Sequence, residues 1–150
     1  MKKITLLFLV QTVFSFAQDF KTPYEKGNGN QTTTYEEMVK FYDDLDKNFE
    51  SISVVEKGKD DNGEPIRVVI FDHSKKQNTS VILINNGIHP GESDGIDATM
   101  MLMRDLALGK IKVPQNTKVA DIEAYNFSGM LRRGKFSRAN QNGPEEYGFR

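Results

Sequence analysis

A histidine and a glutamate stand three residues apart in the stretch NNGIHPGESDGIDA, which spans residues 85–98. Proline lacks a backbone N–H and glycine favours left-handed turns, so His-Pro-Gly-Glu is not expected to lie on a regular helix. A tight loop could instead bring the imidazole of His89 and the carboxylate of Glu92 to one point about 2 Å from each, as zinc requires. The alternative is a turn in which Glu92 only caps the helix that follows.

A third zinc ligand is not evident near this pair. Catalytic zinc generally takes three protein ligands and keeps a fourth position for water or substrate. The other histidine of the chain is His73, in FDHSKK, and the sequence contains no cysteine. A histidine beside two lysines is typical of a solvated strand end, and we favour that interpretation over a ligand. Without cysteine, disulfides and thiolate metal sites are excluded, so zinc would be bound through nitrogen and oxygen.

The residues on either side of the loop predict a strand and a helix. Val81–Ile84 (VILI) is apolar at every position, which favours a strand covered on both faces at the centre of an α/β sheet. A helix should follow the loop, capped by Ser93 or Asp94 and ending at Gly109. Ligands of open α/β sheets gather outside the carboxyl ends of strands, which is where this loop stands.

Two further strands are predicted upstream. Ser51–Glu56 (SISVVE) and Pro65–Asp72 (PIRVVIFD) are rich in β-branched residues, and Asn62-Gly63 between them predicts an antiparallel hairpin. Downstream, VADIEAYN leaves strand and non-strand equally open, because Asp121 and Glu123 stand where a central strand would be apolar.

The region before the hairpin divides into a polar part and a helical part. Residues 18–33 are polar and rich in glycine and asparagine, so we expect a leader segment, with ordered structure beginning near Thr34. Thr34 and Glu37 form a capping box, and apolar residues then recur at three- and four-residue steps. This pattern predicts an amphipathic helix over Tyr35–Phe49.

The first 17 residues have the form of a secretory signal. Two lysines precede an apolar run, and Ser15-Phe16-Ala17 fits a cleavage site after Ala17. A membrane anchor is the weaker alternative, because the run is shorter than the roughly 20 residues that cross a bilayer and contains Gln11. Cleavage leaves 18 basic against 21 acidic residues, a net charge of −3, with no nucleic-acid footprint. We therefore expect an exported protein, periplasmic or extracellular, without a stable membrane span.

Three segments in collinear order resemble the M14 zinc carboxypeptidases. NNGIHPGESDGIDA looks like the His-x-x-Glu metal motif found in a bacterial exported branch of that family. KDDNGEPIRVVIFD is similar to the family's hairpin, and SRANQNGPEEYGFR is similar to the segment after its Asn-x-x-Gly turn, here Asn126 to Gly129. The resemblance runs from roughly Tyr35 to Arg150.

The resemblance implies a fold and a set of residue roles. The fold would be α/β, with a mixed, mostly parallel central sheet and helices on both faces. His89 and Glu92 match the first two zinc ligands. Arg138 matches the arginine that polarises the scissile carbonyl and stabilises the oxyanion, although Arg132 and Arg133 lie close enough to leave the register open. The implied cofactor is Zn²⁺, and the implied partner is a peptide or protein substrate.

Other parts of the family's machinery would lie beyond Arg150: the third ligand histidine, the asparagine–arginine pair that binds the substrate carboxylate, a tyrosine and the glutamate base. Residues 34–150 are thus expected to be the N-terminal part of a longer domain, inactive by itself. DIEAYN also departs from the family, which would have an apolar strand there. The predicted function is removal of C-terminal residues from peptides. Zinc-dependent hydrolysis of N-acyl amino acids or cell-wall peptides, or a non-catalytic binding module, are the alternatives.

Overall fold

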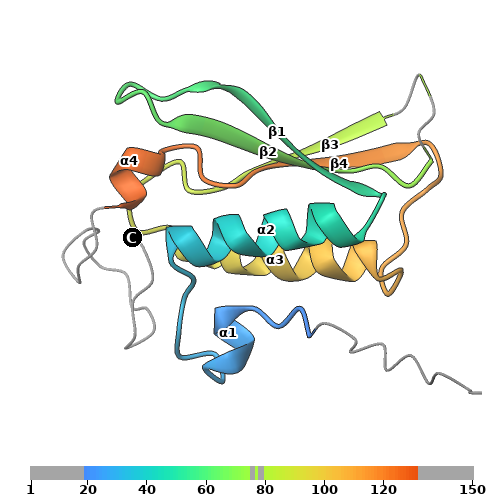
Figure 1. Cartoon of the computed structure of the whole chain (residues 1–150), viewed down its shortest axis with the longest axis horizontal. Helices are drawn as coiled ribbons and strands as arrows, with labels where there is room; N and C mark the ends of the chain where they lie inside the picture. Colours follow the sequence, from blue (N-terminus) through green and yellow to red (C-terminus); the bar gives the residue numbers. More distant parts are fainter. Residues whose placement is uncertain (1–18, 75–76, 78–79, 132–150) are drawn as a thin grey trace, which may run out of the picture.

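A computed structural model describes residues 19–74, 77 and 80–131 of the chain. These residues form one four-stranded sheet with the strand order β1-β2-β4-β3 and two longer helices packed against it (Figure 1). The elements in chain order are α1 (Pro23–Lys26), α2 (Tyr35–Asn48), β1 (Ile52–Lys59), β2 (Pro65–Phe71), β3 (Ser80–Asn85), α3 (Ser93–Ala107), β4 (Thr117–Ile122) and α4 (Phe127–Met130).

Strands β1 and β2 form the predicted antiparallel hairpin. They pair from Ile52 opposite Phe71 at one end to Lys59 opposite Pro65 at the other. The turn is closed by Asp60, whose carboxylate accepts hydrogen bonds from the backbone N–H groups of Asn62 and Glu64. Gly63 adopts φ +86°, a left-handed conformation that favours glycine, so the Asn-Gly pair performs the role expected from its turn chemistry.

The positions of β3 and β4 reverse the expectation from the sequence. VADIEAYN begins inside strand β4, which lies between β2 and β3, antiparallel to the first and parallel to the second. The prediction that VILI is central and covered on both faces is wrong for the described residues, because β3 is an edge strand. Val81, Ile82 and Leu83 are 60%, 51% and 62% exposed. An apolar run shows that a strand lacks a polar face, but it does not identify the neighbours of that strand.

Helix α2 begins at the predicted residue. Thr34 and Glu37 form both hydrogen bonds of the capping box, and the helix ends at Asn48, one residue before the predicted end. Its apolar stripe is buried against the sheet, with Met38 and Leu45 inaccessible to solvent.

Helix α3 also forms as predicted, but its cap differs. The helix ends before Gly109, which has φ +70°. Its N-cap is Glu92 rather than Ser93 or Asp94, and the Glu92 side chain makes no capping hydrogen bond. The carboxylate of Glu92 instead turns back toward His89. The Glu92 carboxylate is thus engaged within the loop rather than with the first turn of α3.

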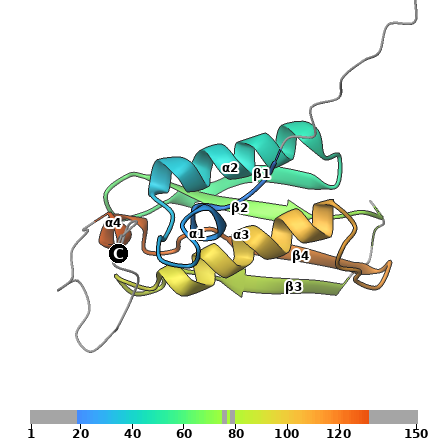
Figure 2. The ribbon, with the colours of Figure 1, turned by 90° about the horizontal axis from the view of Figure 1, so that it is seen from below.

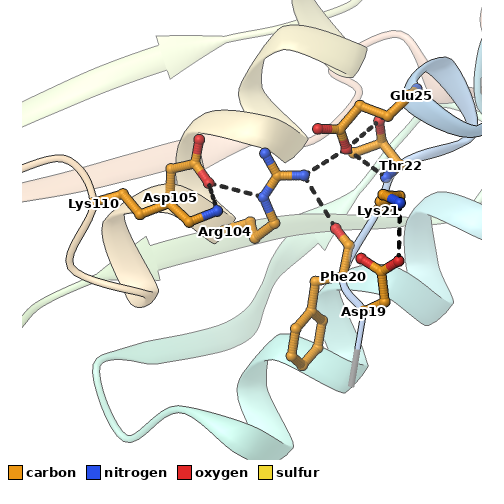
Figure 3. A network of polar contacts seen from close by, with 8 residues as sticks. All are labelled: Asp19, Phe20, Lys21, Thr22, Glu25, Arg104, Asp105 and Lys110. Carbon is orange, nitrogen blue, oxygen red and sulfur yellow. Dashed lines mark hydrogen bonds and ion pairs between the residues drawn. The ribbon is translucent and has the colours of Figure 1, made fainter. Parts of the chain in front are cut away.

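The expectation that ordered structure begins near Thr34 is wrong. Helix α1 has its own capping box, formed by Thr22 and Glu25, and Figure 3 shows how this segment docks on α3. Arg104 donates to the Glu25 carboxylate at 2.5 Å and to the backbone carbonyl of Phe20 at 3.2 Å. These contacts are polar, so a search for apolar periodicity does not detect them.

Both longer helices cover the same face of the described sheet, as the views from two directions show (Figures 1 and 2). The mixed α/β class expected from the sequence is confirmed. Among the described strands one pairing is parallel and two are antiparallel, so the described part of the sheet is not mostly parallel, and its two longer helices do not cover both faces (Figure 1). None of the helices in the described residues is long and apolar enough to span a membrane. The proposed signal sequence lies outside the described residues.

The core is formed by apolar residues of sheet and helices, including Met38, Tyr42, Leu45, Val69, Phe71, Ile96, Met100, Met103 and Val119.

Candidate functional site

The loop that carries His89 and Glu92 connects the end of β3 to the start of α3. Gly87 has φ +58° and Gly91 has φ +84°, so two left-handed residues reverse the chain within a few positions. This reversal brings the two polar side chains together. His89 Nδ1 and Glu92 Oε1 are 2.9 Å apart, and the backbone N–H of His89 donates to Glu92 Oε2 at 3.0 Å. Proline and glycine thus give the loop the tight turn that their chemistry suggested.

The donor atoms of this pair fit a metal ion in type and spacing. An imidazole nitrogen and a carboxylate oxygen that bind one zinc ion, each at about 2.0–2.2 Å, are themselves roughly 3 Å apart. The side chains of His89 and Glu92 are 61% and 28% exposed, so an ion can reach them from solvent. Among the residues that the structure describes, no group of three or more His, Cys, Asp or Glu could hold a metal. The described pair offers two of the three protein ligands that a catalytic zinc site generally takes.

His73 does not belong to this site. It is exposed and follows the carboxyl end of β2, with its ring 5.4 Å from the ring of Phe71. Because β2 runs antiparallel to β4, and β4 is parallel to β3, the carboxyl end of β2 lies at the opposite end of the sheet from the loop. This position agrees with the interpretation of His73 as a solvated strand-end residue.

Arg138, proposed from the family resemblance to stabilise the oxyanion, lies outside the described residues, as do Arg132 and Arg133. Its role stays a prediction. The roles of His89 and Glu92 as metal ligands likewise remain predictions, although their side chains are in contact.

A cleft of about 390 Å³ adjoins the loop. One wall is the turn between β1 and β2, and the other is the connection from β4 to α4. Ser128 of α4 hydrogen-bonds to the Asp60 carboxylate and so joins the two walls. Ile88 lines the cleft immediately before His89, and both Ile88 and Tyr125 are about half exposed. The loop therefore stands beside a concave surface that offers apolar and polar contacts.

Sequence reasoning missed the importance of Asp121, which lies in β4 and is fully buried. Its carboxylate accepts hydrogen bonds from the Tyr42 hydroxyl at 3.0 Å and from Asn86 Nδ2 at 2.8 Å. Burial raises the pKa of Asp121 to about 7, although these two hydrogen bonds act to lower it. Asn86 also donates to the Thr99 hydroxyl at 3.0 Å. A central strand with an acidic residue among apolar ones was the signal for this network.

Glu123 forms a second buried polar group just after β4. Its Oε1 accepts a hydrogen bond from Arg67 Nε at 3.2 Å, and Arg67 also binds the Asp43 carboxylate at 2.7 Å. Burial raises the pKa of Glu123 to about 7, and the positive charge of Arg67 opposes that shift. Glu123 Oε2 has no hydrogen-bond partner among the described residues.

Comparison with known proteins identifies the fold. No model of a known protein family and no curated protein matches the chain. The solved structures that match include carboxypeptidase A from Helicoverpa armigera, with 21% identity and a TM-score of 0.60 over 67% of this chain and 26% of that one. Thrombin-activatable fibrinolysis inhibitor matches with 13% identity and a TM-score of 0.57, over 63% of this chain and 25% of that one.

The bovine form of that inhibitor, solved in complex with tick carboxypeptidase inhibitor, matches with 16% identity and a TM-score of 0.51, over 65% of this chain and 32% of that one. The chain thus spans between a quarter and a third of the length of these solved structures. At such low identity the likeness concerns the fold alone. The described residues have the architecture of part of a carboxypeptidase domain.

Proposed function

We propose that this chain is the N-terminal part of an exported bacterial zinc metallopeptidase of the carboxypeptidase type. The observation that carries the proposal is the contact of 2.9 Å between His89 Nδ1 and Glu92 Oε1, in a loop at the carboxyl end of β3. The carboxypeptidase-like fold supports it, because this end of an α/β sheet is where ligands gather. The proposed reaction is hydrolysis of peptide bonds, with release of C-terminal residues.

The residues of the loop would hold the metal in a defined way. His89 Nδ1 and Glu92 Oε1 would be the donors, and Glu92 Oε2 already accepts the backbone N–H of His89, which fixes the carboxylate. Metal binding would replace the hydrogen bond between the two side chains, so Nδ1 must be unprotonated in the loaded site. Zinc bound there would lower the pKa of a bound water toward about 7 and polarise a scissile carbonyl.

Zinc analysis of the natural full-length protein tests the two ligands. We expect one zinc per chain, and a large loss of zinc in His89→Ala and in Glu92→Ala. His73→Ala is the matched control, since it removes the other histidine of this chain at the opposite end of the sheet and should leave the zinc content unchanged. Unchanged zinc in both loop variants would refute the assignment. Release of C-terminal residues from a peptide panel, compared with cleavage of N-acyl amino acids, then separates the carboxypeptidase from the amidohydrolase alternative.

Arg138 is proposed to stabilise the negative charge that develops on the carbonyl oxygen. In the full-length enzyme, Arg138→Ala should reduce turnover by about 100-fold or more, because a donor aimed at the oxyanion contributes on that scale. The zinc content should be retained. Arg132→Ala is the parallel variant, and if it proves to be the damaging change, the alignment of this segment with the family is displaced.

A further inference from the structure

The loop of the proposed metal site begins at a residue that is fixed from several directions. Asn86 is 7% exposed, and its Nδ2 donates both to Asp121 Oδ1 at 2.8 Å and to the Thr99 hydroxyl at 3.0 Å. Asp121 lies in β4 and Thr99 in α3, so the amide side chain joins the adjacent strand to the helix that follows the loop. Tyr42 of α2 extends the same network through the second oxygen of Asp121.

The backbone of the loop is tied to the same region. The carbonyl of Asn86 accepts the N–H of Tyr125 at 2.8 Å, and the carbonyl of Gly87 accepts the N–H of Asn126 at 3.0 Å. Asn86 also donates its own N–H to the carbonyl of Ile122 at 3.2 Å. The loop therefore leaves the sheet at a fixed point and in a fixed direction, three residues before His89.

The first turn of α3 is fitted to the Asn86 side chain. A Cβ placed on Gly95 would lie 2.5 Å from Asn86 Oδ1, which is closer than real Cβ contacts allow. Glu92 occupies the N-cap position of this same helix, so the position of the helix start determines where the Glu92 carboxylate stands. Asn86, at the start of the loop, thus contacts the helix in which the loop ends.

We infer that Asn86 and Asp121 are positioning residues, which hold the loop so that His89 and Glu92 meet. An amide paired with a carboxylate inside a core costs stability relative to well-packed apolar residues, so its presence beside the loop calls for a role beyond packing. That role is geometric: two hydrogen bonds from the side chain of Asn86 tie the first residue of the loop to β4 and to α3, and the loop spans the gap from β3 to α3. The relevance to metal binding rests on the proposed function, whereas the positioning itself does not.

A swap of the two residues tests the inference with hydrogen bonding conserved. In Asn86→Asp combined with Asp121→Asn, the new amide at 121 can donate to the new carboxylate at 86 and accept from the Tyr42 hydroxyl. Thr99 can donate its hydroxyl to that carboxylate. The single variant Asn86→Ala leaves both partners of Nδ2 unsatisfied. Thr99→Val removes one partner only and serves as the milder variant.

Amide hydrogen exchange, measured by NMR, gives a readout that needs neither zinc nor activity. In Asn86→Ala, the amides of Tyr125 and Asn126 and that of His89 should exchange about 10-fold faster, as loss of buried hydrogen bonds implies. Amides of the ladder between β1 and β2 should change much less. The swap should return the loop amides to within about 3-fold of the natural protein. Thr99→Val should accelerate exchange of the same amides by a smaller factor. This variant decides the outcome if Asn86→Ala does not fold.

Zinc affinity of the full-length protein provides the second readout. Asn86→Ala should weaken binding of added Zn²⁺ by about 10-fold, because loss of residues that orient metal ligands lowers metal affinity on that scale. The swap should restore the affinity. The inference would be overturned if exchange accelerated equally in the loop amides and in the amides of the β1–β2 ladder. It would also be overturned if the loop amides exchanged at unchanged rates in both Asn86→Ala and Thr99→Val. If instead His89→Ala and Glu92→Ala both leave the zinc content unchanged, the proposed function fails, while the exchange data still test the positioning role.

Discussion

Replacement of Asp121 by asparagine should make the protein more stable at pH 8 and alter its stability little at pH 5. The carboxyl is fully buried, and burial raises its pKa from 3.8 to about 7. The folded protein therefore keeps this proton between about pH 4 and pH 7, where the unfolded chain has released it. The free energy of unfolding must fall as pH rises through that window, because the folded state binds more protons there. Asparagine is neutral at every pH and removes this loss.

The size of the effect follows from the pKa difference. One pKa unit corresponds to about 1.4 kcal/mol, so raising the pH from 5 to 8 should cost about 2–3 kcal/mol through Asp121 alone. The hydrogen bonds survive the substitution, since the introduced amide can accept from Asn86 through its oxygen and donate to the Tyr42 oxygen through its nitrogen. Asp97 and Glu123 also have raised pKa values. The titration of Asp97 is present in both proteins and cancels in the difference. The negative charge of Asp121 contributes to the raised pKa of Glu123, so its removal acts in the same direction as the main effect.

Urea unfolding at pH 5, 6, 7 and 8 measures this difference directly. The free energy of unfolding of Asp121→Asn minus that of the natural protein should rise by about 2–3 kcal/mol across the series. Asp61→Asn makes the same chemical change at an exposed position of the hairpin turn and should leave the pH dependence in place. A difference that stays constant from pH 5 to pH 8 would refute the reasoning, because Asp121 would then titrate alike in the folded and unfolded states.

Three further predictions concern the contacts around the loop, the N-terminal segment and the sheet edge. Gly95→Ala should destabilise the fold by about 1–3 kcal/mol, as overpacking does, because the new methyl would overlap Asn86 Oδ1. Thermal unfolding measures this loss of stability. Arg104→Met should expose the bond that follows Lys21 to limited trypsin digestion, because Glu25 and the carbonyl of Phe20 lose their partner, while the core melts within a few degrees of its original temperature. Leu83→Lys should increase the soluble fraction of residues 18–150 expressed alone, since a charge on an apolar edge strand opposes pairing between chains.

The sequence by itself determined the local elements of this protein and the identity of the loop. Capping residues, a turn dipeptide and apolar periodicity are short-range signals, and they placed α2, the β1–β2 hairpin and α3 within a few residues of their observed bounds. The proline and glycine between His89 and Glu92 required a turn for reasons of backbone geometry, and the two side chains do meet.

Only the tertiary structure decided which strand is central and why acidic residues lie inside it. The cost of burying Asp121 depends on Tyr42 and Asn86, which are far away in sequence, so the local pattern left strand and non-strand equally open at β4. The exposure of β3 likewise depends on which strands pair with it and on which face the helices cover. The docking of residues 19–33 depends on Arg104 of α3. These features arise from contacts between distant segments, and a polar group becomes favourable inside a protein only when such a contact satisfies it.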